Sequence, residues 1–179
     1  MRTAGRHVLA ISGSLRTASS NTSLLLAAER LAPPGLRIQR FAGMGALPHF
    51  NPDLEADLPA TVADLRATVD AANGLLISCP EYARGMPGSF KNLLDWLVGS
   101  PNFHAKPVAI FNASPRASEA QRSLRLVLTT MSALVIEDAS ITVDLLTRKL
   151  GPGAIVADAG MAAEIATALT NFSEFVAKP

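Results

Sequence analysis

The sequence contains one cysteine, Cys79, among its 179 residues. A single thiol cannot form an internal disulfide, and it provides neither the paired thiols of a redox motif nor a zinc-binding set. A reducing compartment therefore fits the sequence best. The three histidines, His7, His49 and His104, show no metal-ligand spacing and have no cysteine or acidic cluster nearby, so we expect no metal site.

An excess of charge is also lacking, because 16 lysines and arginines nearly balance 15 aspartates and glutamates. A net charge of +1 creates no broad field for nucleic acid or for an anionic membrane, so we expect neither partner. No apolar run approaches the roughly 20 residues of a membrane-spanning helix. Residues 1–11 lack the apolar region and cleavage site of a signal peptide. The sequence therefore predicts a soluble cytoplasmic protein.

Apolar residues, in contrast, are plentiful at 49%, which is enough for one substantial core, and we expect a single domain spanning residues 1–179. Apolar runs predict strands at residues 8–11, 36–41, 74–79, 107–111 and, as one fifth strand region, 134–136 with 141–145. Helical patterns cover residues 20–31, 58–72, 90–98, 118–131 and 159–176, whereas residues 43–59 are predicted to form a long loop. This alternation predicts an α/β fold with a doubly wound parallel sheet.

Ligands of such folds bind beyond the carboxyl ends of the strands, so three polar loops are candidate sites, those after Ile11, Cys79 and Phe111. The first, residues 12–22, contains six hydroxyl side chains, one amide and the guanidinium of Arg16 at the start of a predicted helix. Backbone N–H groups, the helix dipole, hydroxyls and a forked guanidinium together suit a phosphate monoester without a metal.

Two common nucleotide-binding loops are absent. No Gly-Lys-Ser/Thr ends the segment and no Gly-x-Gly-x-x-Gly is present, which argues against ATP or NAD as the resident ligand. A simpler alternative is that Ser19 or Ser20 only caps the helix while the rest of the loop is solvated.

The second loop, residues 80–88, contains two prolines and two glycines, which fix an irregular backbone. Such a backbone can present N–H and C=O groups to the polar edge of a flat heterocycle, and Tyr82 can add an aromatic face. The alternative is an ordinary turn from strand to helix. Cys79, directly before this loop, is typical of a small core residue, with a redox role as the weaker interpretation.

Two motifs carry a resemblance to a known family: Gly13-Ser14-Leu15-Arg16-x-x-Ser19-x-Asn21, and Pro80-Glu81-Tyr82-x-x-Gly85-x-Pro87-Gly88-x-x-Lys91-Asn92-x-x-Asp95-Trp96. With them the sequence resembles the NADPH-dependent FMN reductases, whose relatives include chromate, quinone and azo-dye reductases. Residues 47–54 look like the rim of the family's active site. The resemblance implies a flavodoxin-like sandwich: a five-stranded parallel sheet with helices on both faces.

The resemblance also implies which residues bind the cofactor. The FMN phosphate would be held by Ser14, Arg16, Ser19, Asn21 and Thr22. The ribityl chain and ring edge would be wrapped by Pro80, Glu81, Tyr82, Ala83, Arg84 and Gly85, with Ser114 in the third loop. This chain departs from the family pattern in two places, because many relatives have Asn where Ala83 stands and a Gly-Gly pair within the stretch 116–119.

The implied activity is a ping-pong reaction with two steps. NADPH or NADH first reduces FMN, and the reduced FMN is then reoxidised by a small-molecule acceptor such as free flavin, a quinone or an oxidised metal ion. The flavin would carry the chemistry, so no catalytic side chain is expected; Glu81 is not needed as a base. Arg84 or Arg116 could attract the phosphate of NADPH, or each could be a solvated surface charge.

Other interpretations of the sequence stay open. An FMN-binding electron carrier or redox sensor would lack nicotinamide activity, although balanced charge argues against a dedicated carrier, and a non-flavin phosphate-binding protein could share the fold. We expect Lys91, Asn92, Asp95 and Trp96 to have packing, capping or subunit-contact roles, and His49 at most a minor substrate role. Relatives pair subunits so that a neighbour's loop closes the flavin site, which implies a homodimer or homotetramer.

Overall fold

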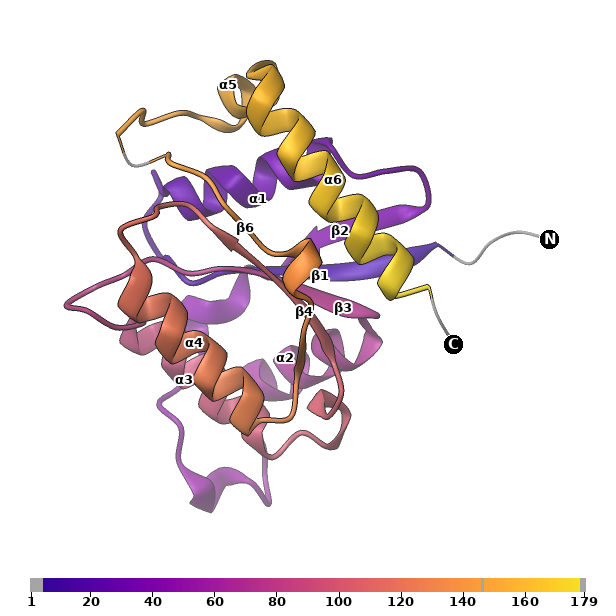
Figure 1. Ribbon diagram of the computed structural model, residues 1–179. Coiled ribbons are helices and arrows are strands. Elements are labelled where there is room, and N and C mark those ends of the chain that lie inside the picture. The colour runs from indigo at the N-terminus through magenta and orange to yellow at the C-terminus, as the bar shows by residue number, and fades with distance from the viewer. Residues whose placement is uncertain (1–4, 146, 178–179) are drawn as a thin grey trace.

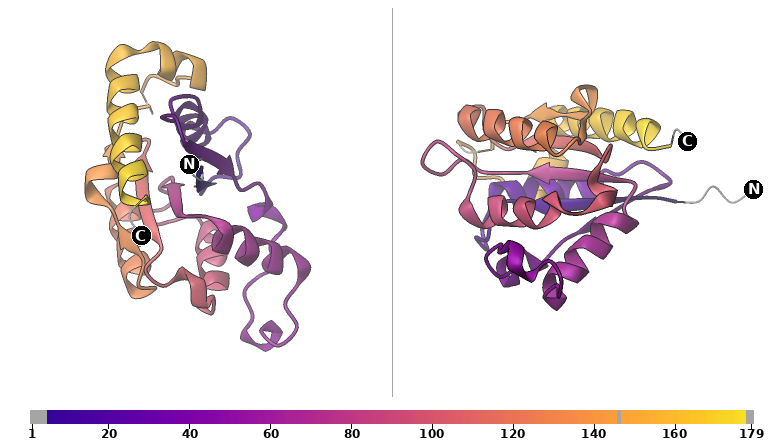
Figure 2. Two further views of the ribbon diagram at one scale, coloured as in Figure 1. Left: turned by 90° about the vertical axis from the view of Figure 1, so that its right-hand side faces the viewer. Right: turned by 90° about the horizontal axis from the view of Figure 1, so that it is seen from below.

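The computed structural model describes residues 5–145 and 147–177, which form one sheet between two layers of helices (Figures 1 and 2). The strands are β1 (Arg6–Ser12), β2 (Leu36–Arg40), β3 (Gly74–Ser78), β4 (Pro107–Asn112), β5 (Leu134–Val135) and β6 (Ile141–Thr142). The helices are α1 (Ser20–Arg30), α2 (Ala60–Ala71), α3 (Gly88–Val98), α4 (Ser118–Thr130), α5 (Pro152–Ala157) and α6 (Ala159–Phe175). The predicted helices agree with these bounds to within two residues, and the prediction lacked only α5.

All strands of the sheet run parallel in the order β2-β1-β3-β4-β5. β6 also pairs with β4, at its carboxyl end, where Phe111 lies opposite Ile141. A 3₁₀ turn, Glu137–Ala139, separates β5 from β6, and the Ser140 hydroxyl accepts the Ile110 N–H at 3.0 Å beside this interruption. β5 and β6 are thus two parts of one edge strand, and the predicted flavodoxin-like sheet with five strand positions is confirmed.

Alternate residues of the central strands face opposite layers of helices, which explains their continuous apolar runs. In β1, Val8 and Ala10 pack with α1, α5 and α6, whereas Leu9 and Ile11 pack with α2, α3 and α4. Both faces of the sheet are therefore buried, and its polar groups are concentrated in the loops at the strand ends. In the described residues, no helix has the length and apolarity needed to cross a bilayer.

The long segment between β2 and α2 is partly ordered into two short 3₁₀ helices, Gly43–Ala46 and Pro52–Leu54. Between them, Pro48 and Phe50 contact α3. The Asn92 amide donates to the Pro48 carbonyl at 2.9 Å and its oxygen accepts the Phe50 N–H at 2.7 Å, while the Trp96 indole donates to the same Pro48 carbonyl at 2.8 Å. Asn92 and Trp96 therefore position the segment that carries Pro48 and Phe50, as expected for packing residues.

Candidate functional site

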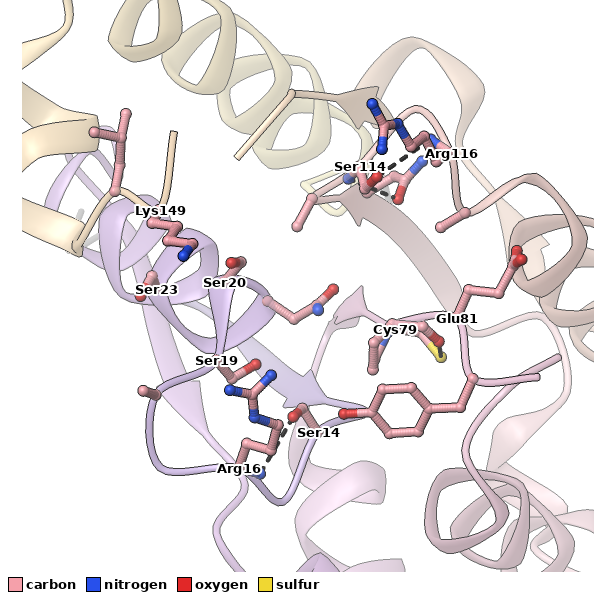
Figure 3. A pocket seen from close by; sticks show the side chains of 18 of the residues that line it. Ser14, Arg16, Ser19, Ser20, Ser23, Cys79, Glu81, Ser114, Arg116 and Lys149 are labelled. Carbon is pink, nitrogen blue, oxygen red and sulfur yellow. Dashed lines mark hydrogen bonds between the residues drawn. The ribbon is translucent and has the colours of Figure 1, made fainter. Parts of the chain in front are cut away.

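A cavity of about 660 Å³ lies at the carboxyl ends of β1, β3 and β4 (Figure 3). All three loops that the sequence singled out contribute to its wall, as does the segment 149–151. Eight of the twelve predicted cofactor-binding residues line it: Ser14, Arg16, Ser19, Asn21, Pro80, Glu81, Tyr82 and Ser114. Sequence reasoning did not single out Ser23, Asn112, Lys149, Leu150 or Gly151, which also line the cavity.

The loop after β1 turns close to the end of β3. The Gly13 N–H donates to the Ser78 carbonyl at 2.8 Å, and a Cβ on Gly13 would lie 3.1 Å from the Cys79 sulfur and 3.2 Å from its Cα. A side chain at this position would therefore push the first loop away from the second. Glycine keeps the two walls of the cavity together.

The start of α1 forms one end of the cavity. Ser19 is the N-cap, and its hydroxyl accepts the Thr22 N–H at 3.4 Å while also lining the cavity. Ser19 thus both caps the helix and lines the cavity. The two interpretations of this serine from the sequence, helix capping and a place in the ligand-binding loop, are therefore compatible. The Thr22 hydroxyl does not line the cavity, because it is hydrogen-bonded to the Ser12 hydroxyl at 2.9 Å.

Asn21 is buried, with 8% of its surface exposed, and lines the cavity. Its Oδ1 accepts a hydrogen bond from the Ser78 hydroxyl at 2.9 Å. This bond fixes the amide so that Nδ2, a donor, is the group available to a ligand.

The second wall contains a tight hairpin. Tyr82 and Gly85 exchange two backbone hydrogen bonds of 2.9 and 3.0 Å, and Ala83 and Arg84 between them have φ values of 50° and 63°. Two positive φ values in a two-residue loop are typical of a type I′ turn. Ala83, Arg84 and Gly85 do not line the cavity, whereas Tyr82, with 47% of its surface exposed, does. The loop thus contributes Pro80, Glu81 and Tyr82 to the wall.

The resemblance to the family implies Asn in many relatives where Ala83 stands here. The turn explains this Asn without any contact to a ligand, because Asn tolerates a positive φ better than alanine does. We expect Ala83→Asn to raise the free energy of unfolding by about 0.5 kcal/mol, measured by urea denaturation. Ala63→Asn, at an exposed position of α2, is the matched control and should be destabilising by a few tenths of a kcal/mol. A lower unfolding midpoint for Ala83→Asn would contradict this account of the turn.

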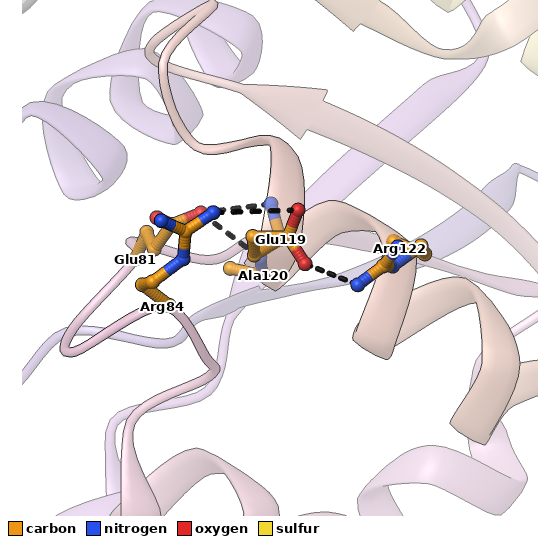
Figure 4. Close-up of polar contacts among 5 residues, drawn as sticks. All are labelled: Glu81, Arg84, Glu119, Ala120 and Arg122. Carbon is orange, nitrogen blue, oxygen red and sulfur yellow. Dashed lines mark hydrogen bonds and ion pairs between the residues drawn. The ribbon is translucent and has the colours of Figure 1, made fainter.

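Glu81 lines the cavity, but its carboxylate is already engaged (Figure 4). Oε2 accepts the backbone N–H groups of Glu119 at 2.9 Å and Ala120 at 3.0 Å, in the first turn of α4. The N-cap of α4, Ala117, provides no side-chain hydrogen bond, so Glu81 caps this helix from another loop. Its role in the structure is to tie the second loop to α4.

Glu81→Ala should lower the free energy of unfolding by about 1–2 kcal/mol, because α4 loses its cap. Glu81→Gln should lose less, since the amide oxygen can still accept both N–H groups. Chemical denaturation of the two variants beside the wild type measures the difference. Equal stability of Glu81→Ala and wild type would show that water caps α4 equally well.

Cys79 is buried beside the cavity, and its thiol donates to the Pro80 carbonyl at 3.4 Å. Burial raises the pKa of this thiol to about 12. The thiol is therefore protonated at neutral pH and is a small packing group rather than a nucleophile. In the described part of the chain, no group of three or more His, Cys, Asp or Glu side chains is placed to hold a metal ion.

The third loop is stabilised by its own side chains rather than by glycine. The Asn112 amide oxygen accepts the Ser114 N–H, and the Ser114 hydroxyl accepts the Arg116 N–H, both at 3.2 Å. The Arg116 side chain lines the cavity. Arg84 does not line the cavity, and its side chain, 83% exposed, lies 3.9 Å from the Glu119 carboxylate.

Comparison with known proteins identifies the family. The model of the NADPH-dependent FMN reductase family matches residues 6–146. An NAD(P)H-dependent FMN reductase of Pseudomonas aeruginosa is 42% identical over 110 residues, which cover 60% of this chain and 59% of that protein. A quinone reductase of Escherichia coli is 29% identical over 178 residues, covering 94% of both chains.

A solved structure supports the same assignment. The flavoenzyme NAD(P)H:acceptor oxidoreductase FerB of Paracoccus denitrificans superposes with a TM-score of 0.74 at 25% identity, over 94% of this chain and 98% of that one. The family match spans the three cavity loops, from β1 to the residues after β6. The chain therefore belongs to the NADPH-dependent FMN reductase family of oxidoreductases.

Proposed function

We propose that this chain is an NAD(P)H-dependent reductase that holds FMN in the cavity and delivers its electrons to a quinone-type acceptor by a ping-pong reaction. The observation that carries the proposal is the meeting of all three predicted loops in one cavity, with hydroxyls, an amide and a guanidinium at one helix start. The acceptor class is suggested by the Escherichia coli relative, a quinone reductase, which is similar along 94% of this chain.

The residues present fit FMN. α1 has eleven residues, and its first turn offers N–H groups, the positive end of the helix dipole and the hydroxyls of Ser20 and Ser23 to a phosphate. Arg16 and the Asn21 amide add two further donors. Bound FMN would supply the redox chemistry, accepting a hydride from NADPH or NADH and returning both electrons to the acceptor.

The side chains of this protein would bind and orient, without transferring a proton themselves. Tyr82 offers an exposed aromatic face beside Pro80, and Asn112 and Ser114 provide polar groups on the opposite loop. The neutral thiol of Cys79 leaves that part of the wall uncharged. Arg116 lines the cavity, so it is better placed than Arg84 to attract the phosphate of NADPH.

We further infer a single FMN-binding domain over residues 1–179, a cytoplasmic location and a homodimer or homotetramer. A small-molecule acceptor would be the partner in the reaction, with no nucleic acid and no membrane. Size-exclusion chromatography with light scattering tests the subunit number directly.

The function is tested by adding FMN to the purified protein and recording the visible spectrum before and after anaerobic NADPH, then NADH. We expect rapid bleaching by at least one nicotinamide and recovery of the oxidised spectrum on adding a benzoquinone. Bound flavin that stays oxidised would favour an electron carrier or sensor. Absence of flavin binding would refute the proposal.

A further inference from the structure

Unpaired positive charge is concentrated in the cavity. Within residues 5–145 and 147–177, most lysine and arginine side chains contact a carboxylate or another acceptor. Four contact neither: Arg16, Arg30, Arg116 and Lys149. Three of these four line the cavity, all except Arg30. Cations left without protein partners in one cavity are typical of an anion-binding site.

Lys149 reaches the cavity from a distant part of the chain. It precedes α5, which packs against α1 through the buried Ile155. Figure 3 shows the Lys149 side chain extending toward the start of α1, where Ser20 and Ser23 lie, whereas Arg16 lies beside Ser14 and Ser19. The two cations thus approach the same helix start from different segments.

The backbone at Lys149 is held in a special conformation. Its φ is 47°, in the left-handed region, and its N–H donates to the Leu145 carbonyl at 2.9 Å. A residue other than glycine in this region costs about 1 kcal/mol, which the surrounding structure must offset. α5 begins three residues later, at Pro152, so Lys149 lies between its hydrogen bond to Leu145 and the start of this helix.

We propose that Lys149 is the second cation of the phosphate-binding end and, together with Arg16, makes the cavity select FMN over riboflavin. This inference rests on the proposed function and extends it to a residue beyond the span 6–146 that the family model matches. A phosphate monoester carries a charge of about −1.5 to −2 at pH 7, which the single positive charge of Arg16 does not balance. The carboxylate that lines the cavity, Glu81, caps α4 instead.

The test is titration of the apoprotein with FMN and with riboflavin, followed by flavin fluorescence. Lys149→Met should raise the Kd for FMN about tenfold, the effect of losing one charge-assisted hydrogen bond, and leave the Kd for riboflavin unchanged. Lys149→Arg should retain FMN affinity. The matched control is Arg37→Met, which removes one positive charge from β2, where Arg37 donates to Gln39 outside the cavity.

The outcomes separate this inference from the proposed function. If the wild type binds FMN and Lys149→Met binds it equally well, Lys149 has no role at the phosphate. If FMN and riboflavin weaken by the same factor, Lys149 shapes the cavity rather than selecting the phosphate, which also overturns the inference. If the wild type binds no FMN, the proposed function and this inference fail together. Thermal unfolding checks folding, and Lys149→Gln replaces Lys149→Met if the methionine variant does not fold.

Discussion

Replacing Arg16 by methionine should weaken FMN binding by about 10- to 100-fold while leaving riboflavin binding and protein stability nearly unchanged. The guanidinium lines the cavity and contacts no acidic group among the described residues, so its removal leaves no protein partner uncompensated. Its forked geometry can donate to two phosphate oxygens, which is why we expect a larger loss than at Lys149.

The comparison variant for Arg16 is Arg30→Met. Arg30 ends the same helix, has no ion-pair partner within residues 5–145 and 147–177 and lies outside the cavity, so its replacement should not change the Kd for FMN. Isothermal titration of both apoproteins at one salt concentration gives the two affinities. A wild-type affinity in Arg16→Met would place the FMN phosphate elsewhere in the cavity.

Trp96→Ala should lower the free energy of unfolding by about 3–5 kcal/mol, the largest stability effect we expect. Trp96 is fully buried, its indole donates to the Pro48 carbonyl, and its ring contacts Phe50 edge to face with centroids 5.0 Å apart. Removing it leaves a cavity and frees the segment that carries Pro48 and Phe50. Urea denaturation measures the loss.

Trp96→Phe separates packing from hydrogen bonding at this position. It keeps most of the volume and loses the indole N–H, so we expect a cost of about 1–2 kcal/mol. Neither variant changes a residue that lines the cavity, and Trp96→Phe should therefore bind FMN as the wild type does. A cost below about 1 kcal/mol for Trp96→Ala would show that the core closes over the missing ring.

Much of the fold was predictable because local patterns encode it. The run of residues 74–79 is apolar on both faces, as a central parallel strand must be, and the spacing of Phe90, Leu93, Leu94 and Leu97 marks one buried face of α3. The edge strand was harder to predict in detail. At its interruption the Ser140 hydroxyl accepts the Ile110 N–H of β4, a contact between residues 30 positions apart that no local pattern encodes.

For the candidate site too, the sequence predicted some features and not others. The position of the loops followed from strand order, since carboxyl ends of parallel strands meet at one edge of the sheet, and residues such as Ser14 and Tyr82 line the cavity for this reason. The directions of the side chains within those loops could not be predicted from the strand order. Thr22 is turned toward Ser12, and the positive φ values of Ala83 and Arg84 carry the hairpin out of the cavity wall.

The sequence by itself therefore determined the fold class, the family and the three loops of the cavity, because each depends on residues close together in the chain. Only the tertiary structure decided that Glu81 caps α4, that Asn92 and Trp96 hold Pro48, and that Lys149 lines the same cavity as the start of α1. These contacts join segments tens of residues apart. They depend on how helices pack on the sheet, which hydrophobic periodicity and turn chemistry leave open.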